Sequence, residues 1–188
     1  MTVFSTPASA DGPVRSVLFV CTGNVCRSPF AELLLRTQVA GLAVASRGTY
    51  ALVDSEMEQQ MAGQLSLRGV SSAGFRSRQL EIEDLEADLV LTMSDRQRAL
   101  ILEENPAAAR RTGQLGHVPE LLSLTGGAPL TRERVADWSR RSHPAGRNVP
   151  DPYRRSPETA ARSAQMIDDL VAQLADLLQR RAPEAPRR

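Results

Sequence analysis

Short apolar runs alternate with longer segments of helical periodicity along this chain. Three runs, residues 17–20, 42–46 and 87–92, have the length and mostly apolar character of strands buried in a parallel sheet. A weaker fourth run lies within residues 112–118. Apolar residues from Ala164 to Leu178 recur every three or four positions, which predicts an amphipathic helix. This alternation predicts an α/β fold: a single domain with a four-stranded parallel sheet and helices on both faces.

Residues that commonly cap helices indicate where the helices begin. Ser28-Pro29 predicts the start of the first helix, with Ser28 as cap, Pro29 at the first helical position and Glu32 in the first turn. Ser55-x-x-Glu58 has the spacing of a capping box and predicts a helix that ends near Gly69. Further helices are expected after Ser94, after Ser156, and within residues 80–85, 121–124 and 131–141.

Length and composition restrict the class of protein. The 188 residues suit one domain, which we divide into a flexible N-terminal arm (1–14), a folded domain (15–181) and a C-terminal tail (182–188). No segment approaches the roughly 18 consecutive apolar residues of a membrane span, and no signal peptide is evident, so we expect a cytoplasmic protein without a membrane partner. A net charge of +1 does not favour nucleic acid as a partner. The sequence leaves the oligomeric state open.

The cysteines and histidines narrow the chemistry further. The two cysteines, Cys21 and Cys26, are too few for a disulfide framework and suit a reducing compartment. The two histidines, His117 and His143, do not have the spacing of metal ligands. We therefore expect neither a metal nor another cofactor.

The loop after the first strand has the features of an anion site. A short loop between a strand and a helix N-terminus turns backbone N–H groups inward, above the positive end of the helix dipole. Gly23 and Asn24 tolerate the positive φ that such a loop needs, and Arg27 can grip two phosphate oxygens. A thiol in this field loses its proton easily, so Cys21 is expected to be a thiolate aimed at phosphorus. The expected phosphate-binding residues are Thr22, Gly23, Asn24, Val25, Cys26, Arg27 and Ser28.

A second group is needed to protonate the leaving oxygen of a phosphate ester. Asp151 lies between Pro150 and Pro152, so its backbone is stiff and biased to an extended conformation. Tyr153 and the last helix follow directly. An isolated Asp-Pro is typical of a turn, but in a chain that also has a phosphate-binding loop Asp151 is a candidate for this proton donor.

These two motifs resemble the low-molecular-weight protein tyrosine phosphatase family, whose signature joins a strand, Cys-x5-Arg-Ser-Pro and a helix. The resemblance extends from about Ser16 to Leu178 and implies the phosphotyrosine phosphatase I-like fold. It implies hydrolysis of phosphotyrosine in a protein substrate through a phosphocysteine intermediate. The implied roles are as follows: Cys21, Arg27 and Asp151 are catalytic, Asn24, Ser28 and Ser46 support the loop and its thiolate, and Tyr50 and Tyr153 wall the cleft.

Departures from the family pattern concern the substrate more than the chemistry. The family often has a His near the position of Phe75, and a second aromatic residue where this chain has Arg154. The segment from Gly126 to Val149 is longer than usual.

Three alternatives follow from the same residues. A protein arginine phosphatase of the same fold carries Thr where this chain has Val25, which favours tyrosine here. An arsenate reductase needs further cysteines, and none follows Cys26. A non-catalytic anion-binding or redox-sensing module would have no use for Asp151.

Overall fold

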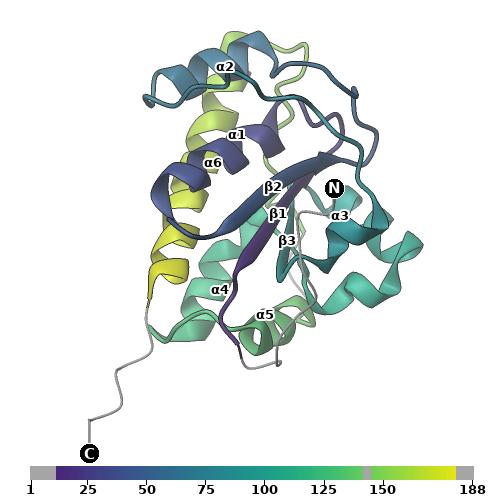
Figure 1. Cartoon of the computed structure of the whole chain (residues 1–188), viewed down its shortest axis with the longest axis vertical. Coiled ribbons are helices and arrows are strands. Elements are labelled where there is room, and N and C mark those ends of the chain that lie inside the picture. Colours follow the sequence, from purple (N-terminus) through teal and green to yellow (C-terminus); the bar gives the residue numbers. More distant parts are fainter. Residues whose placement is uncertain (1–11, 142–144, 181–188) are drawn as a thin grey trace, which may run out of the picture.

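Four parallel strands form the centre of the molecule in the computed structural model, which describes residues 12–141 and 145–180 (Figure 1). The strands are β1 (Ser16–Cys21), β2 (Ala43–Gly48), β3 (Leu89–Thr92) and β4 (Thr112–Gln114), in the order β2-β1-β3-β4. The predicted four-stranded parallel sheet is therefore confirmed. From β1 the chain runs to β2 on one side of β1, and from β2 it crosses back to β3 on the other side of β1. The carboxyl ends of β1 and β3 therefore flank a switch point, the place where ligands bind in such sheets.

Helices cover both faces of this sheet, as predicted. One face carries α1 (Arg27–Gln38), α2 (Gln59–Ser66), α4 (Val118–Thr125) and α6 (Pro157–Gln179). The other face carries α3 (Asp95–Glu104) and the 3-10 helices η1 (Ile82–Glu86) and η2 (Pro106–Arg110). A third 3-10 helix, η3 (Leu115–His117), leads into α4, and α5 (Arg132–Ser139) follows it.

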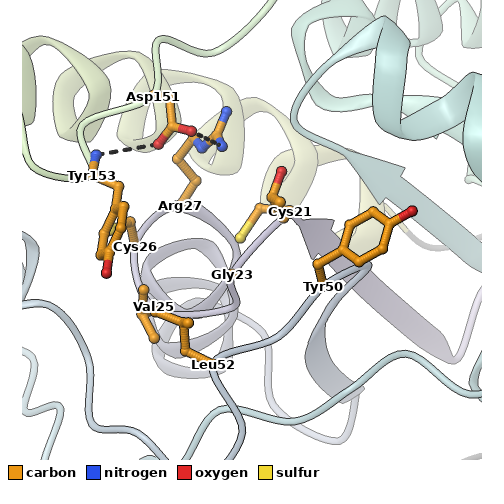
Figure 2. A pocket seen from close by; sticks show the side chains of 10 residues that line it. Cys21, Gly23, Val25, Cys26, Arg27, Tyr50, Leu52, Asp151 and Tyr153 are labelled. Carbon is orange, nitrogen blue, oxygen red and sulfur yellow. Dashed lines mark hydrogen bonds and ion pairs between the residues drawn. The ribbon is translucent and has the colours of Figure 1, made fainter.

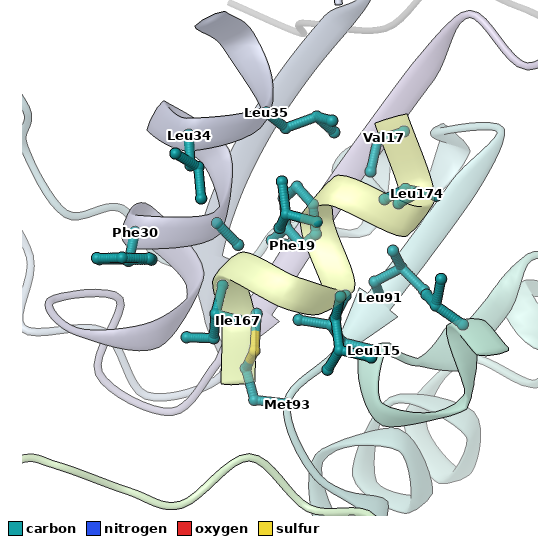
Figure 3. Close-up of a cluster of buried hydrophobic side chains, with 14 of the residues drawn as sticks. Val17, Phe19, Phe30, Leu34, Leu35, Leu91, Met93, Leu115, Ile167 and Leu174 are labelled. Atoms are coloured by element: carbon teal, nitrogen blue, oxygen red, sulfur yellow. The ribbon is translucent and has the colours of Figure 1, made fainter. Parts of the chain in front are cut away.

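Strand β1 is apolar on both sides because it contributes to two cores. Val17 and Phe19 point into the larger core with α1 and α6 (Figure 3), and Cys21 belongs to the same core. Leu18 and Val20 point into the smaller core with η1, α3 and η2. This alternation fixes the strand tightly, since a slip by one residue would exchange its two faces. The loop after Cys21 therefore starts from a rigid position.

Two of the four predicted caps are confirmed and two are wrong. Ser94 and Ser156 cap α3 and α6 by accepting backbone N–H bonds. Helix α1 begins two residues early, at Arg27 instead of Pro29, and its N-cap Cys26 makes no side-chain capping bond. Helix α2 begins after Glu58, whose own carboxylate accepts from the Met61 N–H, so the capping box predicted with Ser55 does not form.

Helix α5 covers the edge strand β4. The ring of Trp138 lies so close to Gly113 that a Cβ there would stand 2.1 Å from two ring carbons. Any larger residue at position 113 would displace the ring. Helix α5 lies within the segment predicted to be unusually long, so part of that segment packs on the edge strand of the sheet. Before this segment, α4 has eight residues, longer than the single turn expected around residues 121–124.

The expected arm and tail fall mainly outside the described residues, which exclude 1–11 and 181–188. Gly12 to Val14 are described and lie along the start of α5. Pro13 forms a bridge with Thr131, and the Val14 N–H donates to the Leu130 carbonyl. Among the described helices, none is both long and apolar enough to cross a membrane.

Candidate active site

The backbone of the loop after β1 turns its carbonyl groups outward. The carbonyls of Cys21, Thr22, Gly23 and Val25 accept N–H bonds from the segment between β2 and α2, and that of Cys26 accepts from Phe30. In a planar trans peptide the N–H points opposite to the carbonyl, so the N–H groups of these peptides face the space that the loop encloses. Asn24 has a φ of 54°, as predicted for a residue that lets the loop close. The arrangement is an anion cradle at the N-terminus of α1.

Gly48, at the end of β2, permits this wrapping. A Cβ at Gly48 would stand 2.5 Å from the Thr22 carbonyl oxygen and 2.9 Å from the Ala51 Cα. The Tyr50 N–H donates to that same Thr22 carbonyl at 3.0 Å. A side chain at position 48 would therefore push the 49–52 segment off the loop.

A chain of hydrogen bonds ends at the sulfur of Cys21. The backbone N–H of Arg78 donates to Asn24 Oδ1 at 2.8 Å, which fixes the orientation of the Asn24 amide. Its Nδ2 then donates both hydrogens, to Ser28 Oγ at 2.9 Å and to Ser46 Oγ at 2.8 Å. Ser28 Oγ lies 3.0 Å from Cys21 Sγ and donates to the Arg47 carbonyl at 3.3 Å. Because Ser28 already accepts from Asn24, its one proton can turn from the more distant Arg47 carbonyl to stabilise a thiolate on Cys21.

This contact explains why Ser28 does not cap α1. Its hydroxyl faces the thiol and Asn24 from inside the first turn of the helix, so the cap position passes to Cys26. The structure brings together Asn24, Ser28 and Ser46, the residues that the resemblance assigned to the support of the loop. Glu32, predicted in the first turn of the helix, lies beyond that turn, and its contact with this group was not predicted: its Oε2 accepts from Ser46 Oγ at 2.6 Å. Burial raises the pKa of the Glu32 carboxyl, against the opposing effect of the Ser46 hydrogen bond.

Arg27 and Asp151 meet across the pocket although 124 residues separate them. Arg27 Nη2 donates to Asp151 Oδ2 at 2.7 Å, and Nη1 donates to the Val149 carbonyl at 3.3 Å. The Arg27 side chain is buried, whereas that of Asp151 is 54% exposed. The Arg27 Nε is also buried and has no hydrogen-bond partner among the described residues. A buried donor of this kind is rare in proteins unless a ligand uses it.

The segment that carries Asp151 is held by the ends of β3 and β4. The Val149 N–H donates to the Met93 carbonyl at 2.9 Å. Asn148 Oδ1 accepts from the Asp95 N–H at 2.9 Å and from Gln114 Nε2 at 2.8 Å. These contacts bring the acid to the switch point of the sheet. Asn148 is a positioning residue without any local signal in the sequence, because its partners are distant along the chain.

A pocket of about 180 Å³ opens above Cys21. Figure 2 shows Tyr153 on one side of the thiol, Tyr50 on the other, and Asp151 joined to Arg27 above it. Val25 and Leu52 complete the apolar part of the wall. Thr22, Gly23 and Cys26 also line this pocket. The structure thus gathers the predicted nucleophile, cation, acid and both aromatic walls around one space.

The two cysteines differ in electrostatic setting. Burial raises the pKa of the Cys26 thiol, and the neighbouring Cys21, Glu58 and Asp151 charges raise it further. Cys26 is therefore a neutral thiol at physiological pH, although it lines the same pocket as Cys21. No group of three or more His, Cys, Asp or Glu side chains that could hold a metal occurs within 12–141 and 145–180.

The sequence matches the family described as low molecular weight phosphotyrosine protein phosphatase over residues 16–184. A putative low molecular weight protein-tyrosine-phosphatase of Klebsiella pneumoniae is 31% identical over 154 residues, which cover 81% of this chain and 90% of that protein.

Solved structures show the same similarity. The YwlE arginine phosphatase of Geobacillus stearothermophilus superposes with a TM-score of 0.70 and 30% identity, covering 89% of this chain and 94% of its own. The tyrosine phosphatase Wzb of Escherichia coli K30, in complex with sulphate, gives a TM-score of 0.68 and 26% identity over 86% of this chain and 96% of its own.

Proposed function

This chain belongs to the low molecular weight phosphotyrosine protein phosphatase family, and we propose that it hydrolyses phosphotyrosine in protein substrates through a phosphocysteine on Cys21. The observation that carries the proposal is the meeting of Cys21, Arg27 and Asp151 around one pocket. A thiolate, a planar cation and a carboxyl in reach of one phosphoryl group are the parts that this reaction needs.

In the first step, the Cys21 sulfur attacks phosphorus in line with the ester oxygen. A sulfur–phosphorus bond forms while the phosphorus–oxygen bond breaks, and Asp151 gives its proton to the departing phenolate. The inward N–H groups and Arg27 bind the three equatorial oxygens and stabilise their charge. Phosphoryl binding also draws the guanidinium away from Asp151, which leaves the carboxyl free to carry a proton.

In the second step, Asp151 takes a proton from water and the resulting hydroxide oxygen attacks phosphorus. The sulfur–phosphorus bond breaks, inorganic phosphate leaves and the thiolate is restored. The hydrogen bond from Ser28 stabilises the thiolate both as reactant and as leaving group. No step needs a metal or another cofactor.

The walls of the pocket favour an aromatic ester. Tyr50 and Tyr153 lie on opposite sides of Cys21, where their rings can contact a phenyl ring of the substrate. Only 5% of the surface of Val25 is exposed, and its Cγ2 would lie 3.6 Å from a Cβ added to Gly23. This side of the pocket therefore presents methyl groups instead of hydrogen-bonding groups.

Protein arginine phosphatase activity is the second candidate, because one of the similar structures is an arginine phosphatase. The guanidinium leaving group of phosphoarginine is polar, and a pocket that offers it no hydrogen-bond partner discriminates against this substrate. Val25 cannot supply the hydroxyl that Thr would offer at the same position. The choice between the two substrates thus depends on the residue at position 25, and the catalytic groups are the same for both activities.

A direct comparison of substrates tests the proposal. We expect kcat/KM for phosphotyrosine peptides to exceed that for matched phosphoarginine peptides at least about tenfold, and Val25→Thr to narrow this ratio. Matched phosphoserine peptides, whose phosphate lies on a short side chain without an aromatic ring, serve as the control. A wild-type preference for phosphoarginine peptides would overturn the assignment of phosphotyrosine as the substrate, but it would not contradict the two-step mechanism.

We place the reaction in the cytoplasm, with tyrosine-phosphorylated proteins as partners. Cys21 must stay reduced to act as a nucleophile, and a reducing compartment keeps it so.

A further inference from the structure

The residue after Tyr153 has a backbone conformation that its side chain does not favour. The Arg155 N–H donates to the Pro152 carbonyl at 2.9 Å, closing a tight turn with Tyr153 and Arg154 at its centre. Arg154 has a φ of 54°, in the left-handed region. A turn with positive φ at its third residue strongly favours Gly or Asn. Strained residues of this kind collect at functional sites, and this one directly follows the pocket wall.

The side chain of Arg154 is held over that wall. Its Cζ lies 5.2 Å from the centre of the Tyr153 ring, within the range of a cation–π contact. Tyr153 in turn lines the pocket above Cys21. The guanidinium therefore lies against the ring that forms one wall of the pocket.

The charge of Arg154 has no carboxylate to neutralise it within the described part of the chain. The nearest carboxylate in sequence, Asp151, already pairs with Arg27 and accepts from the Tyr153 N–H. Arg76, by contrast, is paired with Asp54 and Glu56. An oriented cation without an internal partner is available to a ligand that enters between the two tyrosines.

We propose that Arg154 is a specificity-determining residue that binds a carboxylate on the residue next to phosphotyrosine. The inference rests on the function proposed above and names its substrate class: phosphotyrosine flanked by Asp or Glu. Because the guanidinium already contacts the Tyr153 ring, the arginine side chain loses less conformational entropy when it binds a carboxylate. The same contact holds its charge near the pocket wall.

The test uses two phosphotyrosine peptides that differ only in Glu or Gln on both sides of phosphotyrosine, with 4-nitrophenyl phosphate as a reference that has no flanking residues. The readout is the ratio of kcat/KM for the Glu and Gln peptides. For the wild type at low salt we expect a ratio of about 2 to 5, the size of one exposed charge pair. The ratio should fall toward 1 in about 1 M salt, which screens such charges.

Four variants separate the roles of charge and structure. Arg154→Gly and Arg154→Ala should both bring the ratio close to 1, and Arg154→Lys, which keeps the charge, should restore it. Because Gly suits a positive φ, Arg154→Gly should have a thermal midpoint at or above that of Arg154→Ala. Arg155→Ala removes the same charge one residue away, without a stack, and should keep the wild-type ratio.

Three results would overturn this inference: a wild-type ratio of 1, an unchanged ratio in Arg154→Gly, or an equal fall in Arg155→Ala. An unchanged ratio together with an equal loss of kcat/KM for all three substrates would make Arg154 a support for Tyr153 only. If the wild type hydrolyses neither phosphotyrosine peptide, the proposed function itself fails. If it hydrolyses both equally, only the role of Arg154 fails.

Discussion

Arg27 donates from Nη2 to Asp151 Oδ2 at 2.7 Å, so the cation that binds the phosphoryl group is paired with the acid that serves the leaving group. The pair joins the N-terminus of α1 to the segment before α6. It also places a negative charge beside the phosphate cradle. A bound phosphate dianion and the Asp151 carboxylate must therefore compete for one guanidinium.

The first prediction concerns this competition. Asp151→Asn removes the charge that competes for Arg27, so inorganic phosphate should bind about fivefold more tightly or better. The inhibition constant against 4-nitrophenyl phosphate measures it, even on the low residual activity. Asp137→Asn, on α5, makes the same charge change away from the pocket and should leave the constant unaltered. Weaker phosphate binding in Asp151→Asn would mean that the pair orients Arg27 more than it restrains it.

The second prediction concerns the proton that Asp151 gives. Asp151→Asn should lower kcat/KM, which reports the first step alone, by roughly 10²–10⁴-fold for phenyl phosphate, whose leaving group needs that proton. The loss in kcat/KM should be much smaller for 4-nitrophenyl phosphate, because its phenolate leaves unaided. A plot of log kcat/KM against leaving-group pKa gives the comparison. Parallel lines for wild type and variant would remove Asp151 from the role of general acid.

The third prediction concerns Glu32 and pH. Burial raises the pKa of its carboxyl above the usual 4.5. A carboxyl whose pKa is higher in the folded state than in the unfolded state contributes its full stabilisation at a pH below the unfolded pKa. This contribution is lost as the pH rises through the folded pKa. Glu32→Gln does not titrate, so its free energy of unfolding relative to the wild type should increase between about pH 4 and pH 7.5.

Urea unfolding at the two pH values measures this difference. Glu104→Gln, at an exposed position in the last turn of α3, makes the same side-chain change without burial and serves as the control. A difference between Glu32→Gln and wild type that is the same at both pH values would show that the carboxyl is not perturbed.

The fourth prediction concerns the two thiols. Because burial raises the pKa of Cys26, its thiol stays protonated and should react slowly at neutral pH. Iodoacetamide should modify Cys21 first, and inorganic phosphate should slow this reaction by filling the loop. Peptide mass spectrometry locates the adduct, and Cys21→Ser should remain almost unlabelled over the same period. Equal labelling of Cys26 would contradict the assignment of the nucleophile.

The parts of the site that the sequence could predict are those that are local along the chain. β1, its loop and the start of α1 follow one another directly, so the cradle can be read from residues 17–29. Asp151 lies in a short motif whose two prolines already restrict its backbone. The helix α6 is regular enough that its apolar stripe predicts which face is buried.

The parts that the sequence could not predict depend on contacts between distant residues. Asn148 anchors the acid through Asp95 and Gln114, and no local pattern records this. Ser28 matched a capping signal, but its hydroxyl is used by Cys21 and Asn24. Such competition between a helix cap and a tertiary contact is decided only once the chain has folded.

The covalent intermediate on Cys21 is the centre of this account, and a trapping experiment tests it directly. Asp151→Ala should still transfer the phosphoryl group from 4-nitrophenyl phosphate, yet hydrolyse the phosphocysteine slowly, because Asp151 no longer activates water. Intact-protein mass spectrometry after a rapid acid quench should show one added phosphoryl group, and peptide mapping should place it on Cys21. No adduct during turnover, or an adduct on any other residue, would contradict the mechanism.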